Sequence, residues 1–145
     1  RSTGYDELRT GEVCGLTMAT DAIDILQAAM ESVAFRLAEI LDRIESVCPV
    51  REVITSGGAI TASPVWPQMI ADVLGRDIEV NSETEASLRG AVLLALEKTG
   101  KMEITDWLSA IKTRTISSHP TCHAVYRKAR NRHQSVYGSI DNTDK

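Results

Sequence analysis

Apolar residues recur at three- and four-residue steps along the segment that follows the polar first dozen residues. They are Ile23, Leu26, Met30, Val33, Leu37, Ile40, Ile44 and Val47. This spacing predicts one long amphipathic helix that ends near Cys48–Pro49, with Thr20 as its N-cap and Asp21 and Asp24 in its first turn. A short strand is expected before it, at Glu12–Leu16. A coiled coil is the competing interpretation, but the α/β pattern downstream favours packing of this helix against a sheet.

Short runs of β-branched and apolar residues alternate with helical patterns in the middle of the chain. Val53–Ser56 and Asp77–Val80 are expected as strands. Between them Ser63 can cap a helix with Pro64 at its first position, and Gly75 can stop that helix. A β-α-β crossover of this kind normally joins parallel strands with a right-handed connection. The pattern therefore predicts a small sheet flanked by helices.

Three further helices are expected in the second half of the chain. Ser82 and Glu85 have the spacing of a capping box at the start of the first, which Gly100 closes. The apolar spacing over residues 104–111 suggests a short second helix. A Ser-Ser-His-Pro break then precedes a terminal helix that runs to about Ser139.

Composition and charge exclude several classes of protein. The chain has 145 residues, 43% apolar and 25% charged, which is typical of one globular domain with a single core. Its net charge of −4 gives no electrostatic reason to expect nucleic acid or anionic lipid as a partner. No apolar run approaches the roughly 18 residues that a membrane span needs.

The cysteines suggest the cellular compartment of the protein, and the first residues suggest that the chain is part of a longer polypeptide. Cys14, Cys48 and Cys122 are odd in number, far apart and without a secretory peptide before them, which favours a reduced, cytoplasmic protein. The first residues have no initiator methionine and read as an interior segment, so we expect a fragment of a longer polypeptide. Three short strands are few for so much helix, and further strands are expected from residues before Arg1.

A pair of glycines, Gly57 and Gly58, follows the strand at Val53–Ser56 directly. Ligands of open α/β sheets bind at such strand tips, where glycine lets the backbone approach a phosphate or a ribose closely. The alternative is an ordinary strand-to-helix turn that needs a positive φ. A glycine pair alone does not decide between the two.

His119, Cys122 and His123 bring three potential metal ligands into five residues. No fourth partner is evident elsewhere, so the pattern does not meet the spacing of a structural zinc site and we predict no metal site. The chain also has no Ser/His/Asp signature, no GxxxxGK[ST] loop and no CxxC motif, and no catalytic residue is assigned.

The glycine segment and several separated blocks, in order, resemble the C-terminal domain of the FGGY carbohydrate kinases, most closely the gluconate kinase-like members. The matching residues are Gly15-Leu16-Thr17-x-Ala19-Thr20, Glu31-x-Val33-Ala34-Phe35-Arg36, Gly57-Gly58, Ser63-Pro64-x-Trp66, Gln68, Ala71-Asp72-Val73-Leu74-Gly75 and Glu85 with Arg89-Gly90-Ala91. The resemblance covers nearly all of residues 1–145. It implies an actin-like, ribonuclease H-like α/β fold with a small mixed sheet flanked by helices, the C-terminal half of a sugar kinase.

The resemblance also implies an activity. It suggests an ATP-dependent carbohydrate kinase of the EC 2.7.1 type, which moves the γ-phosphoryl group of ATP to a hydroxyl of a sugar or sugar acid, gluconate being the best guess. Gly57, Gly58 and Ala59 would pass close to the nucleotide, and Ser63 near its adenosine end. The catalytic aspartate, the sugar site and most contacts to Mg²⁺ would belong to the protein's own N-terminal domain, so this chain alone would phosphorylate nothing.

A second hypothesis comes from a different class of protein. The long helix could offer its apolar face to a partner, which would make the chain a non-catalytic interaction module that forms homodimers.

Overall fold

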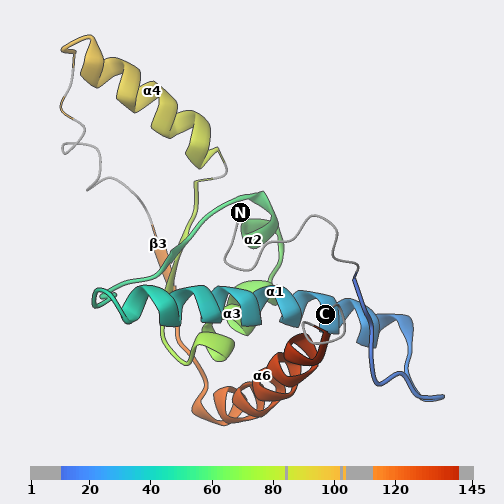
Figure 1. Cartoon of the computed structure of the whole chain (residues 1–145). Coiled ribbons are helices and arrows are strands. Elements are labelled where there is room, and N and C mark those ends of the chain that lie inside the picture. The colour runs from blue at the N-terminus through green and yellow to red at the C-terminus, as the bar shows by residue number, and fades with distance from the viewer. Residues whose placement is uncertain (1–10, 84, 102, 104–112, 141–145) are drawn as a thin grey trace. The chain divides into compact units, whose positions relative to one another are not determined.

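The computed structural model describes residues 11–83, 85–101, 103 and 113–140. These residues belong to two compact units, Arg1–Pro49 and Val50–Lys145 (Figure 1).

The first unit contains the long helix that the apolar spacing predicts, α1 (Ala22–Glu45). Its N-cap is Asp21, one residue later than expected, because the Asp21 carboxylate accepts the backbone N–H groups of Ile23 (2.8 Å) and Asp24 (2.9 Å). The Asp24 carboxylate accepts the Asp21 N–H in return (3.0 Å), which completes a capping box.

The strand expected at Glu12–Leu16 is wrong, since these residues form neither helix nor strand. Gly15 has a φ of 77°, which turns the chain out of an extended conformation within the short apolar run.

Two ion pairs join neighbouring turns of α1. The Glu39 carboxylate lies 2.6 Å from Nη1 of Arg36 and 2.7 Å from Nη2 of Arg43. Burial by itself raises the pKa of Glu39, but the hydrogen bonds and positive charges of the two guanidinium groups outweigh burial and lower that pKa.

The second unit is built on a mixed sheet of three strands, β1 (Ile54–Thr55), β2 (Ile78–Asn81) and β3 (Thr113–Ile116), in the order β1-β2-β3. β1 and β2 are parallel, with Thr55 opposite Val80, as the crossover predicts. β3 pairs with β2 in the antiparallel direction and was not expected from the sequence. Its four residues, Thr-Arg-Thr-Ile, are largely exposed and carry no apolar alternation.

The described residues of the second unit also form four helices: α2 (Gly58–Ala62), α3 (Trp66–Leu74), α4 (Ala86–Lys98) and α6 (Pro120–Ile140). Of these, α2 and α3 contact the sheet, and α6 contacts α3. Gly75 ends α3 and α6 reaches Ile140, as predicted. The helix expected within residues 104–111 lies outside the described residues.

The predicted helix starts need two corrections. α3 begins at Trp66 rather than Pro64, with Val65 as its N-cap, and the Ser63 hydroxyl accepts the backbone N–H of Trp66 (3.1 Å). The expected capping box of Ser82 and Glu85 does not form, since the N-cap of α4 is Glu85 itself and its side chain accepts no N–H.

The core of the second unit lies between α3 and the sheet. Its buried apolar side chains include Met69, Ile70 and Val73 of α3 with Ile78 and Val80 of β2. α3 contacts both the sheet and α6 (Figure 1). These contacts explain why six of its nine residues are buried.

The structure also bears on two features of the sequence, its apolar runs and its three cysteines. Among the residues described, none of the helices is long and apolar enough to traverse a bilayer. All three cysteines are free and exposed.

We predict that Gly75→Ala destabilises the second unit far more than Gly100→Ala. Both glycines have a left-handed φ, 66° and 68°, so each substitution costs about 1–2 kcal/mol of backbone strain. Only at Gly75 would the new Cβ meet another group, the ring nitrogens of His123 at 2.6 and 2.7 Å, whereas nothing lies within 4 Å at Gly100. Urea unfolding should therefore give an additional loss of about 1–3 kcal/mol for Gly75→Ala. Equal losses for the two variants would contradict the close packing of His123.

Candidate functional site

The turn after β1 is made by a glycine that the backbone requires. Gly57 has a φ of 113° and a ψ of 153°, a conformation that side chains with a Cβ rarely adopt. Its carbonyl then accepts the backbone N–H groups of Ile60 (3.1 Å) and Thr61 (3.0 Å), which starts α2 directly after the strand. The positive φ of a strand-to-helix turn is therefore present at Gly57.

At Gly58, by contrast, the backbone conformation does not require a glycine. Its φ is not positive, and a Cβ placed on it would meet no heavy atom within 4 Å. Gly58 and Ala59 are both exposed, and the space where a Cβ would stand on Gly57 is also open. The turn thus presents bare main chain on an open surface of the second unit.

Ser63 lies at the other end of α2, where it is the C-cap residue. At about 1.5 Å per residue, the five residues of α2 separate Gly57 from Ser63 by roughly 8 Å. The Ser63 hydroxyl already accepts the Trp66 N–H, so any further contact would use its own hydrogen or its second lone pair. The four predicted nucleotide-binding residues therefore follow one short helix from end to end.

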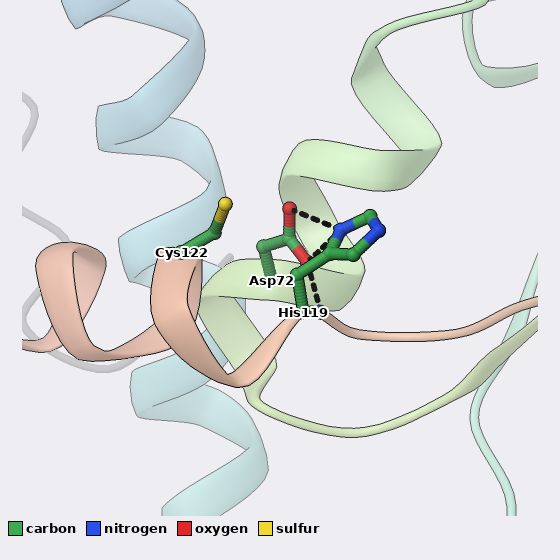
Figure 2. Close-up of side chains that lie close together, drawn as sticks. All are labelled: Asp72, His119 and Cys122. Atoms are coloured by element: carbon green, nitrogen blue, oxygen red, sulfur yellow. Dashed lines mark hydrogen bonds and ion pairs between the residues drawn. The ribbon is translucent and has the colours of Figure 1, made fainter.

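A second cluster of polar groups surrounds Asp72 on α3 (Figure 2). The Asp72 side chain is 7% exposed, and its Oδ1 accepts the backbone N–H of His119 at 2.7 Å and Nε2–H of Gln68 at 3.1 Å. The imidazole Nδ1 of His119 lies 3.2 and 3.4 Å from the two carboxylate oxygens. A buried carboxylate of α3 thus caps the N-terminus of α6.

The contact between α3 and α6 is reciprocal. Nδ1 of His123, in the first turn of α6, lies 2.9 Å from the backbone carbonyl of Asp72, near the C-terminus of α3. Each helix therefore satisfies a terminal polar group of the other. This role of Asp72 was not predicted; the local signal for it is a His-Pro helix start without Ser, Thr, Asp or Asn at the N-cap.

Asp77 has a similar structural role at the junction of β3 with α6. Its carboxylate accepts the N–H of Ser118 (3.1 Å) and the hydroxyl of Ser117 (3.2 Å). The structure thus accounts for both aspartates near the glycine segment through contacts with residues 117–119.

The start of α4 carries an ion pair and an open groove. Nη1 of Arg89 lies 2.8 Å from the Glu83 carboxylate. The groove has a volume of about 540 Å³, and none of the four predicted nucleotide-binding residues lines it. A Cβ placed on Gly90 of this helix would meet nothing within 4 Å. The residues that line the groove are Glu83, Glu85, Leu88, Arg89, Val92, Leu93 and Leu96.

The fold defined by this sheet and its helices is that of the sugar kinases. A xylulose kinase from Rhodospirillum rubrum has a crystal structure that matches with a TM-score of 0.78 at 22% identity, over 95% of this chain and 29% of that one. The chain therefore has the actin-like ATPase fold of these kinases, as predicted.

The sequence comparisons then give the family. Residues 1–97 match the C-terminal domain of the FGGY family of carbohydrate kinases, and the chain belongs to this family. A probable L-xylulose kinase from Pasteurella multocida is 31% identical over 112 residues, which are 77% of this chain and 23% of that protein. A gluconokinase from Bacillus licheniformis is 33% identical over 101 residues, 68% of this chain and 20% of that protein. The chain spans less than a third of the length of these relatives.

We predict that Asp72→Ala lowers the free energy of unfolding by about 1–3 kcal/mol, because it leaves the His119 N–H without its acceptor. Asp77→Ala is the matched control, since its carboxylate also accepts a backbone N–H, but at an exposed position, and should cost less. Amide hydrogen exchange should show faster exchange at His119 only in Asp72→Ala. Unchanged exchange there would contradict the proposed cap.

Proposed function

We propose that residues 1–145 form the nucleotide-facing C-terminal domain of an ATP-dependent carbohydrate kinase. The complete protein would transfer the γ-phosphoryl group of ATP to a hydroxyl of a sugar or sugar acid. Membership of the FGGY family supports this reaction class. Because the chain spans a small part of its relatives, sugar binding and catalysis would need the protein's own N-terminal domain, and this chain alone would be inactive.

The observation that carries the proposal is the open main chain at Gly58. The fold does not need glycine there, since φ is not positive and a Cβ would have free space. A ligand that approaches the backbone closely would explain the missing side chain. We therefore assign Gly57, Gly58 and Ala59 to the nucleotide and Ser63 to its adenosine end.

The chemistry of this surface fits one part of a phosphoryl-transfer site. Residues 53–75 include no lysine and no histidine, and the turn itself (residues 54–63) has no ionisable side chain at all. It can offer backbone groups and hydroxyls to ATP, but not the carboxylates that Mg²⁺ prefers. Phosphoryl transfer depends mainly on positioning and on neutralising charge. The ligands of Mg²⁺ and the catalytic base would accordingly come mainly from the N-terminal domain.

Gluconate is our best guess for the substrate. It rests on the likeness to gluconate kinases, and the identity to a gluconokinase (33%) is close to that to a probable L-xylulose kinase (31%). Assays of the complete protein with gluconate, xylulose and glycerol would decide among them. We further propose a cytoplasmic location, where the three exposed thiols would stay reduced.

The second candidate function, an interaction module that dimerises through α1, is favoured by exposed apolar side chains on that helix. Ile23 is 72% exposed and Leu26 61% exposed. Titration with ADP distinguishes the kinase proposal from the interaction module. The kinase proposal predicts changes in the chemical shifts of the backbone amides of residues 56–63. Concentration-dependent shifts confined to residues 23–47, without a response to nucleotide, would support the module instead.

We predict that Gly58→Ala weakens nucleotide binding without weakening the fold. Alanine at this helical position should leave the free energy of unfolding unchanged or raise it by about 0.5–1 kcal/mol. The new methyl group would stand between backbone and nucleotide, so we expect the Kd for ADP, or the KM for ATP of the complete protein, to rise about tenfold or more.

Gly11→Ala is the matched control, because Gly11 is also open and without a positive φ but lies outside the turn. It should leave the affinity for nucleotide unchanged. An unaltered affinity in a well-folded Gly58→Ala variant would argue against the assigned turn.

A further inference from the structure

A buried carboxylate, an imidazole and a thiol converge where α3 meets the first turn of α6 (Figure 2). One ligand atom from each of Asp72, His119 and Cys122 lies within 4.8 Å of the other two. We propose that these three side chains bind a divalent cation of the zinc class, with water in the fourth position.

The sequence argued against a metal site because the cluster around residue 119 had no partner elsewhere in the chain. The fold supplies that partner, since Asp72 comes from α3, 47 residues before His119. It also removes His123 from the set, because Nδ1 of His123 faces the carbonyl of Asp72 instead. His119 and Cys122 remain, the first directly before α6 and the second in its first turn.

The distances suit a small tetrahedral ion. Two ligands about 2.0 Å from zinc at the tetrahedral angle lie about 3.3 Å apart. Nδ1 of His119 lies 3.2 and 3.4 Å from the oxygens of Asp72, close to this value. The thiolate of Cys122 would have to lie about 3.5 Å from the other two ligands. Cys122 is exposed and its Sγ lies within 4.8 Å of the other two ligand atoms, so its side chain would have to move inward by about 1 Å on binding the ion.

Hydrogen bonds already hold the side chain of Asp72 in place in the metal-free protein. Asp72 is fixed by the His119 N–H and by Gln68, whose Nε2 also donates to the carbonyl of Ser117 (2.9 Å). Such outer hydrogen bonds orient a carboxylate ligand. His119, with a side chain 60% exposed, and Cys122 leave a path from solvent to the buried oxygen atoms.

The chemistry of the ligands selects the ion. In the metal-free protein the Nδ1–H of His119 can donate to Asp72, and the cation would take the place of this proton. A carboxylate, a thiolate and a neutral imidazole together balance a charge of +2. Thiolate and imidazole favour Zn²⁺ or Co²⁺ over Mg²⁺, so the site is separate from the Mg²⁺ of the proposed kinase reaction.

The test is a titration of the chelator-treated 145-residue chain with Co²⁺, followed by its displacement with Zn²⁺. We expect one equivalent to bind, with a thiolate-to-cobalt charge-transfer band that Zn²⁺ abolishes. Zn²⁺ should also raise the Tm of the second unit, and Mg²⁺ should not.

Two variants remove ligands while the cap of α6 stays. Cys122→Ser changes an exposed side chain, and His119→Ala keeps the backbone N–H that Asp72 accepts. Each should weaken Co²⁺ binding about tenfold or more, and Cys122→Ser should also abolish the charge-transfer band. Cys48 is another exposed cysteine, and Cys48→Ser is the matched control. It should change neither the affinity for Co²⁺ nor the charge-transfer band. Absence of stoichiometric binding, or a charge-transfer band that survives in folded Cys122→Ser, would overturn the proposal.

Discussion

The buried carboxylate of Asp72 is the contact on which the C-terminal part of the second unit depends. A charge at such a position is stable only when hydrogen bonds replace its hydration, and the backbone N–H of His119 at 2.7 Å is the shortest of those it accepts. The same residue offers its backbone carbonyl to His123. One residue of α3 therefore fixes both the start and the first turn of α6. Gly75 makes this possible, since any side chain there would occupy the place of the His123 ring.

α3 connects this contact with the proposed nucleotide surface. At its N-terminus the Trp66 N–H donates to the hydroxyl of Ser63, the last of the four residues assigned to the nucleotide, and its C-terminus carries Asp72 and Gly75. Because α3 is packed between the sheet and α6, the helix has little freedom to shift along its axis. The open turn at Gly57 and Gly58 is thus joined to a helix in which six of nine residues are buried.

The division of chemical roles follows from the side chains that are present. The turn after β1 offers main chain and hydroxyl groups, whereas both nearby aspartates are engaged in holding residues 117–119. Their contacts explain these carboxylates without a catalytic role. This agrees with the proposal that the chain positions the nucleotide, whereas the charged catalytic groups would come from elsewhere in the complete protein.

The sequence by itself determined the features that depend on neighbours along the chain. The apolar spacing predicted α1 and α6, the β-branched runs predicted β1 and β2, and Gly75 was recognised as a helix stop. Patterns of neighbouring residues failed at the expected Ser82 capping box, since Glu85 is the N-cap of α4, and at Gly15, where a positive φ turns the chain.

Tertiary structure alone decided the contacts between distant residues. β3 has no apolar alternation of its own and becomes a strand because β2 offers an edge to pair with. The role of Asp72 could not be predicted because its partners lie 47 and 51 residues away. Hydrogen bonds of this range depend on how helices pack on a sheet, and a pattern read along the chain carries no information about that packing.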